Sequence, residues 1–314
     1  MRLSEPGRSA AAAERLPIRT EWPTVILALV IYGGWALATW RHAAMPWPIR
    51  ALVGGWLLAW QGSLQHEVIH GHPTPRRWLN TLIGWIPLSL WLPFERYRSS
   101  HLDHHAAEAL TEPGPDPESR YLARRAGIAG ALAKLAGELQ ATLLGRIIFG
   151  PIVDVVRFAA SELWSGGGRG GRRIWVTHAL GVFALVAWLK LVCGMDLGDY
   201  VLTFVYPGAA LTLIRSYAEH RAHVLPERRV AVVEKAPILG LLFLNNNLHA
   251  VHHHHPAAPW YGLPQIYRRG RNAVLQANGG LVYDGYAEVF RRYLLRRHDV
   301  LVHPSLAAKT KPAG

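Results

Sequence analysis

The chain has 314 residues and only one cysteine, Cys193. A single cysteine excludes a disulfide framework and any cysteine-held metal cluster within one chain. The sequence also contains neither a four-cysteine iron site nor an HPGG haem-binding segment. Any metal that the chain holds must therefore be bound through nitrogen or oxygen.

Charge is missing from four stretches, although the segments between them are rich in arginine. This contrast is typical of membrane proteins, and a charge-free run of about 20 residues is long enough to cross a bilayer. Three of the runs are shorter than this length and need polar flanks or tilt to complete a crossing. We predict an all-α integral membrane protein with four transmembrane helices in two hairpins, at Trp22–Trp40, Ala51–Gln65, Ile174–Leu189 and Tyr200–Ile214.

The positive charge is distributed unevenly between the two sides of these predicted helices. Of 34 Lys and Arg residues, only Arg41, Arg50 and Lys190 fall in the two hairpin turns. By the positive-inside rule, both termini lie in the cytosol, and the chain is a multi-pass protein of the inner (cytoplasmic) membrane. The formal net charge of +13 fits anionic lipid headgroups better than nucleic acid, so no nucleic-acid partner is expected.

Two further apolar stretches do not have the pattern of a simple crossing. Leu122–Trp164 is interrupted by charges and has the basic amphipathic pattern of helices that lie in the membrane interface. Leu79–Phe94 contains two prolines and is ambiguous by itself. The predicted regions are a disordered cytosolic tail at 1–20, a membrane domain at 21–270, and a basic cytosolic C-terminal tail with an amphipathic helix at 271–314.

Thirteen of the 17 histidines are concentrated in four short segments. In a helix, residues at i, i+3 and i+4 share one face, so these segments predict histidine-lined helix faces. The segments are HEVIHGH with His66, His70 and His72, HLDHH with His101, His104 and His105, EHRAH with His220 and His223, and HAVHHHH with His249, His252, His253, His254 and His255.

The number of histidines on these faces indicates two metal ions. Spacing at i, i+3 and i+4 places eight imidazoles on these faces: His66, His70, His101, His104, His105, His249, His252 and His253. Eight imidazoles exceed the four ligands of a structural zinc. They suit two ions that each take five or six ligands and keep a position open. Neutral imidazole binds iron, zinc and copper, so the ligand type alone does not name the metal.

The histidine faces can meet only if they emerge on the same side of the membrane, which requires an even number of crossings between them. The third and fourth spans lie between His105 and His220. Only Leu79–Phe94 lies between His70 and His101, so we predict that it does not cross and forms a re-entrant or interfacial hairpin. The di-metal site is therefore expected in a cytosolic helical cap.

The boxes HEVIH, HLDHH and HAVHH, with two helical hairpins between them, resemble the membrane fatty acid desaturase superfamily over roughly residues 22–267. The resemblance implies a cap that holds two iron ions and uses O2 as co-substrate. It also implies a lipid or acyl substrate and a separate electron donor, such as a ferredoxin with its reductase. The expected reaction is desaturation of a fatty acyl chain.

The resemblance also implies a set of ligands. They are His66, His70, His101, His104, His105, His249, His252 and His253, with His220 as a ninth, 29 residues before His249. Ser216 stands where acyl-CoA desaturases have an asparagine. We expect His72, His223, His254 and His255 to lie outside coordinating reach.

Polar residues beside the boxes are candidates to orient the ligands by accepting a ring N–H. Glu67, Asp103 and Glu219 each neighbour a box histidine, and solvated charge is the alternative for all three. Asn245, with the two asparagines that follow it, could serve the last box in the same way or cap its helix.

Other functions fit part of the pattern. Fatty acid hydroxylation or carotenoid hydroxylation or ketolation is the nearest alternative, because the ending PWYGLP also resembles carotenoid ketolases. HEVIH matches the H-E-x-x-H motif of zinc proteases, but an intramembrane protease leaves both HxxHH boxes unexplained. A metal carrier needs polar groups within its spans, and the predicted spans contain almost none.

Overall fold

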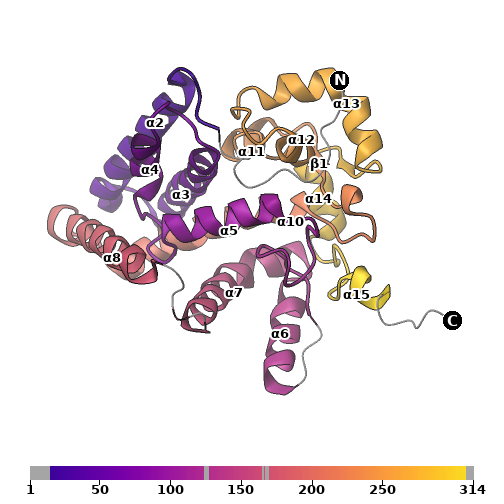
Figure 1. Cartoon of the computed structure of the whole chain (residues 1–314). Helices are drawn as coiled ribbons and strands as arrows, with labels where there is room; N and C mark the ends of the chain where they lie inside the picture. The colour runs from indigo at the N-terminus through magenta and orange to yellow at the C-terminus, as the bar shows by residue number, and fades with distance from the viewer. Residues whose placement is uncertain (1–14, 124–126, 165, 167–169, 309–314) are drawn as a thin grey trace. The chain divides into compact units, whose positions relative to one another are not determined.

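The computed structural model describes residues 15–123, 127–164, 166 and 170–308, and these residues are mostly helical (Figure 1). Their contacts divide the chain into two compact units. Unit 1 contains Ser100–Gly150 and the segment from Leu213 onward, and unit 2 contains Leu16–Ser99 and Pro151–Thr212. Most of the predicted tail 1–20 lies outside the described residues, and the predicted boundary at residue 270 falls inside a helix. The predicted domain division stays a prediction.

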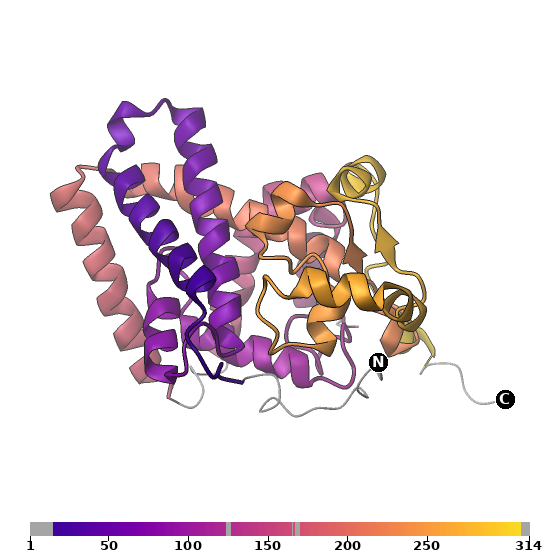
Figure 2. The same ribbon diagram turned by 90° about the horizontal axis from the view of Figure 1, so that it is seen from above.

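Unit 2 begins with two long helices that pack side by side, as Figure 2 shows: α2 (Trp22–Trp40) and α3 (Trp47–Ile69), joined through the 3-10 helix η1 (His42–Ala44). A proline in the first turn of α2 is tolerated because its missing N–H is not needed there. The other elements are α4 (Arg77–Trp85), α8 (Gly171–Ala187), the π-helix η2 (Trp188–Val192), α9 (Leu197–Tyr200) and the π-helix η3 (Val201–Val205). Residues of α5 (Phe94–Ala106), α7 (Leu143–Trp164) and α10 (Tyr206–Glu219) belong to both units.

Three helical segments in the described part of the chain are long and apolar enough to cross a membrane: Trp22–Trp40, Gly171–Val192 and Leu197–Glu219. They contain the first, third and fourth predicted spans. Leucines such as Leu29 and Leu180 are exposed on these segments, which suits a surface that faces lipid. The second predicted span lies within α3, which does not meet the same criteria of hydropathy and charge. The number of four spans and their pairing in hairpins stay predictions.

The apolar stretch Leu79–Phe94 is not one continuous helix. It contains the end of the nine-residue helix α4, followed by irregular backbone from Ile86 to Pro93, with Leu90 in the left-handed region at φ 70°. Nine helical residues rise about 14 Å, roughly half the hydrocarbon thickness of a bilayer. The helical part of this segment is therefore shorter than a crossing needs, and the predicted re-entrant or interfacial hairpin stays a prediction.

The carbonyl groups of this irregular segment and of the last turn of α4 are bonded by side chains from the neighbouring helices of unit 2. Such bonds matter because backbone that is buried among apolar helices cannot reach water. Gln65 donates to the carbonyl of Gly84 at 2.7 Å and Gln61 to that of Ile86 at 3.0 Å. The remaining bonds are Tyr32 to Ile83, Tyr200 to Leu88 at 2.8 Å, and His178 to Leu90 at 2.8 Å.

Replacing Gln65 by leucine should destabilise unit 2, because it leaves the buried Gly84 carbonyl without this donor. The expected loss in free energy of unfolding is about 1–3 kcal/mol. Denaturation of the detergent-solubilised protein measures the effect. The control is Thr212→Val, which removes a hydroxyl bonded to the helical carbonyl of Gly208 at 3.0 Å. That carbonyl keeps its backbone donor, so a loss as large as that of Gln65→Leu would contradict the explanation.

Unit 1 holds most of the histidine boxes and a core of short elements. The strands β1 (Val232–Val233) and β2 (Val282–Tyr283) pair in parallel, which adds one small sheet to the predicted all-α fold. Val232, Val251 and Leu263 are almost fully buried in its core. The other elements are α6 (Gly127–Leu139), the 3-10 helix η4 (Pro226–Arg228), α11 (Pro237–Leu242), α12 (His249–His254), α13 (Leu263–Ala277), α14 (Tyr286–Tyr293) and α15 (Pro304–Ala308).

The stretch predicted to lie in the membrane interface, Leu122–Trp164, contains the helices α6 and α7. Ile128, Leu132 and Leu135 lie three or four residues apart on α6 and are all exposed, Ile128 to 82%. This is the amphipathic pattern that the sequence predicts. The position of these helices at a membrane surface stays a prediction.

Candidate metal centre

The second histidine box lies on α5. The helix starts after Pro93, and its last two turns carry His101, His104 and His105 at the predicted spacing. His101 and His104 are buried, with exposed fractions of 3% and 1%. The ring centroids of His101 and His105 are 4.7 Å apart, and those of His104 and His105 are 5.7 Å apart. The three imidazoles therefore form one cluster.

The last box forms the short helix α12, which begins at His249. His249 and His253 are one helical turn apart, and their Nε2 atoms are separated by 3.1 Å. His220 follows the end of α10, and its backbone forms an isolated bridge to Val230. This position brings His220 Nε2 to 3.0 Å from His249 Nε2.

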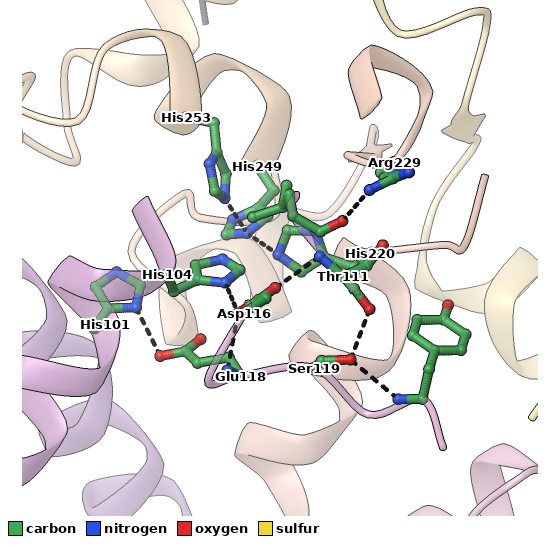
Figure 3. Close-up of polar contacts among 12 residues, drawn as sticks. His101, His104, Thr111, Asp116, Glu118, Ser119, His220, Arg229, His249 and His253 are labelled. Atoms are coloured by element: carbon green, nitrogen blue, oxygen red, sulfur yellow. Dashed lines mark hydrogen bonds and ion pairs between the residues drawn. The ribbon is translucent and has the colours of Figure 1, made fainter. Parts of the chain in front are cut away.

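Within unit 1, four histidines each offer a ring nitrogen within 4.8 Å of the others: His104, His220, His249 and His253 (Figure 3). Two nitrogens bound at right angles to one metal, at about 2.1 Å each, lie about 3.0 Å apart. The Nε2 separations of 3.0 and 3.1 Å agree with this requirement. His104 Nε2 is also buried without a hydrogen-bond partner among the described residues, as expected of a nitrogen directed at a metal. The donor set fits a metal ion.

A second set lies in the same unit and consists of the other histidines of the second and last boxes, His101, His105 and His252. His105 Nε2 and His252 Nε2 are 3.1 Å apart, and the ring centroids of His101 and His252 are 6.4 Å apart. In unit 2, His66 and His70 are both buried where α3 ends, with ring centroids 4.9 Å apart. The first box thus forms the two-nitrogen face that its spacing predicts.

Two carboxylates that the sequence analysis did not single out contact the second box. Asp116 Oδ1 lies 2.8 Å from His104 Nδ1, and both side chains are about 1% exposed. Glu118 Oε1 lies 3.1 Å from His101 Nδ1. A carboxylate on Nδ1 holds the proton there and leaves the Nε2 lone pair free for a metal. The signal for these residues was the turn-forming, acidic run EPGPDPE that follows HLDHH.

Of the residues predicted to orient the ligands, some lie beside a histidine ring nitrogen and others do not. Glu219 Oε1 lies 3.3 Å from His249 Nδ1, but Glu67 Oε1 is 3.9 Å from His66 Nδ1, beyond hydrogen-bond distance. Asp103 is exposed on α5. Asn245 donates to the carbonyl of Trp260, and its neighbour Asn246 contacts His249 Nδ1 at 3.0 Å instead.

Burial keeps most of these imidazoles neutral. It lowers the pKa of His220 to about 3, assisted by the charge of His104, and it lowers the pKa values of His249 and His253 well below 6.5. His104 differs, because Glu118 and the bond to Asp116 outweigh its burial and raise its pKa. The histidine charges lower the pKa of Glu118 against the effect of burial. Neutral imidazoles are the form that binds metal, so burial favours the metal-binding form of His220, His249 and His253.

The four histidines of these segments that are not predicted ligands contact other groups. His72 is buried and its Nδ1 lies 2.9 Å from the carboxylate of Glu21. His223 accepts the backbone N–H of Leu225 at 2.9 Å. His254 and His255 line a small pocket against α13. Ser216 donates to the carbonyl of Leu213 at 3.4 Å.

The comparison with known families finds one match, described as Fatty acid desaturase, over residues 41–285. The match contains all four histidine segments and ends before α14. No curated protein matches the chain.

Proposed function

The chain belongs to the fatty acid desaturase family, and from this premise we propose that it is an O2-dependent oxidoreductase that desaturates a fatty acyl chain. The observation that carries the proposal is the group of four histidines in unit 1 that each offer a ring nitrogen within 4.8 Å of the others. Oxidation of a lipid follows from the family, and the three apolar helical segments support access from a membrane.

We assign the ligands to two iron ions. His104, His220, His249 and His253 would hold one, and His101, His105 and His252 would hold the other, each set being supported by its Nε2 contacts. The remaining ligands of the second iron are His66 and His70, which the order of the boxes implies. Two bound irons would supply the redox chemistry that activates O2 and abstracts hydrogen from a CH2 group.

The chain's own residues hold the imidazoles in position. The carboxylates of Asp116 and Glu118 fix the Nδ1 protons of His104 and His101, and Glu219 and Asn246 surround Nδ1 of His249. A ligand whose ring is fixed by such a partner needs less reorganisation when the metal binds. The overall reaction consumes one O2, two electrons and two protons for each double bond formed, and it releases two waters. The electrons come from a separate carrier such as a ferredoxin, which docks on the basic cytosolic side.

The alternatives are less well supported. The PWYGLP ending keeps carotenoid or fatty acid hydroxylation or ketolation as the second candidate. In an H-E-x-x-H protease, the metal ligands would be His66 and His70, and the four-histidine group of unit 1 contains neither. A zinc protease therefore leaves this four-histidine group without a role.

Comparing the lipids of a host that expresses the chain with those of a host that expresses His104→Ala tests the proposal. We expect fatty acids that have lost two hydrogens, and two irons per chain in the purified protein. Products that have gained oxygen would favour hydroxylation or ketolation. Metal analysis showing one zinc and no iron, with unchanged lipids, would exclude the proposed function.

A further inference from the structure

The carboxylates that contact the second box come from one short loop, Leu110–Ser119, which we call the acidic loop. Asp116 is bonded at both oxygens: Oδ1 accepts the N–H of Glu118 at 2.9 Å, and Oδ2 accepts the N–H of Thr111 at 2.7 Å. Ser119 closes the loop by donating to the carbonyl of Thr111 at 2.6 Å (Figure 3). The conformation of Thr111 therefore sets the positions of both carboxylates.

Thr111 has a conformation that a threonine rarely adopts. Its φ is +68°, in the left-handed region, and it is 2% exposed. A β-branched residue in this region is strained and keeps the conformation only when its surroundings hold it there. The conformation of Thr111 therefore depends on the contacts that its backbone and side chain make.

The C-terminal segment, residues 298–305, supplies one of these contacts. His303 is fully buried, and its Nε2 lies 2.9 Å from Thr111 Oγ1. Its Nδ1 accepts the N–H of Ser305 at 3.3 Å and contacts the Ser305 hydroxyl at 2.7 Å. Because Nδ1 is an acceptor, the neutral ring carries its proton on Nε2 and donates to Thr111.

Two more contacts attach the same segment to the chain that follows the acidic loop. Tyr121 donates to Asp299 Oδ2 at 2.7 Å, and Leu122 N–H donates to the carbonyl of Leu301 at 2.8 Å. Asp299 Oδ2 also accepts the N–H of Ala222 at 2.6 Å, two residues after His220. All of these residues belong to unit 1. The segment lies beyond residue 285, where the match to the family ends, so family membership does not imply these contacts.

We propose that His303 is a positioning residue for the metal centre, which holds Thr111 so that the acidic loop presents Asp116 to His104 and Glu118 to His101. The residues predicted as a C-terminal tail thereby become part of the support of the histidine cluster. This inference rests on the proposed function for its metal, but the hydrogen-bond chain from His303 to His104 is independent of the metal's identity.

Two substitutions of His303 by amide side chains test its bond to Thr111 and its bond to Ser305 separately. Glutamine places its amide nitrogen near the position of Nε2 and keeps the bond to Thr111, whereas asparagine reaches only the position of Nδ1 and keeps the bond to Ser305. We expect His303→Asn to release iron to a chelator about 3- to 10-fold faster than the native chain, which corresponds to the loss of one hydrogen bond. His303→Gln should release it at the native rate.

A second measurement does not require metal. In the metal-free protein, the amides of Thr111 and Glu118 should exchange with deuterium faster in His303→Asn than in His303→Gln. Thr111→Val should reproduce His303→Asn, and the double variant should add nothing further, because both changes remove the same bond. Equal metal release and equal exchange in the asparagine and glutamine variants would overturn the proposal. If the native chain holds no metal, the proposed function fails, and unchanged amide exchange in His303→Asn would still overturn the role of His303.

Discussion

Replacing His253 by alanine should abolish oxidation and remove at least one metal from the purified chain. His253 Nε2 lies 3.1 Å from His249 Nε2 in the four-histidine group of unit 1. Changes to residues that merely orient a ligand lower metal affinity or activity by about 10- to 100-fold. Loss of the ligand itself should therefore reduce turnover by more than about 100-fold. Metal content and lipid products, measured on the same preparation, check this expectation.

The neighbouring residue provides a matched control. His254 follows His253 on α12 but is rotated by about 100° around the helix. It lines the small pocket against α13 and is outside the four-histidine group. We expect His254→Ala to keep its metal and its products. Similar metal loss in both variants would mean that α12 itself had unfolded, and full metal content in His253→Ala would remove His253 from the ligand set.

The parts of this fold that the sequence predicts are those with a local signal. Glu21 and Arg41 bracket a charge-free run, and α2 begins and ends beside them. The spacing of the second box predicts a shared helix face, and α5 provides it, because residues three and four apart are neighbours on any helix. The stretch before α5 contains two prolines and its backbone is irregular there, while its predicted re-entrant or interfacial hairpin stays a prediction.

The residues that orient the histidines could not be predicted in the same way. Asp103 precedes His104, so helical rotation turns it about 100° away from the ligand face and into solvent. The carboxylate that His104 does contact, Asp116, is 12 residues away and reaches it only because a turn-rich loop returns to α5. Asn245 lies in the left-handed region at φ 56°, and this turn directs its neighbour to His249 instead. The contacts of Asp116 and Asn246 both depend on how a turn folds back toward a histidine, and such turns have no periodic pattern in the sequence.

The second predicted span shows why hydropathy alone does not identify every helix of unit 2. Its predicted charge-free run is part of a longer helix, α3, which also carries buried polar residues that serve the structure. Gln61 and Gln65 lower its hydropathy, yet Gln61 bonds a carbonyl group of the irregular segment before α5 and Gln65 bonds one in the last turn of α4. Hydropathy counts these side chains as unfavourable in a membrane, whereas their partners make them favourable.

The glycines of α3 lead to the second large expected effect, which concerns the folding of unit 2. A Cβ added to Gly54 would lie 2.5 Å from the backbone oxygen of Thr203 and 2.6 Å from the ring of Phe204. A Cβ added to Gly55 would lie 2.8 Å from the Cβ of Pro207. Small residues allow helix backbones to approach closely within a membrane, where packing is a main source of association. This close approach is what fixes α3 against the helix that contains η3.

Gly54→Val should therefore lower the free energy of unfolding of the solubilised protein by about 3 kcal/mol or more, because a backbone oxygen cannot move aside as a flexible side chain can. Gly33→Val on α2 is the control, since a Cβ at Gly33 meets no neighbouring atom within 4 Å in the described part of the chain. An exposed helical position of this kind should change stability by less than about 0.5 kcal/mol. Denaturant titration of both variants measures the difference. Equal stability of the two would show that α3 and the helix with η3 can separate without loss, and that the close contact at Gly54 does not hold unit 2 together.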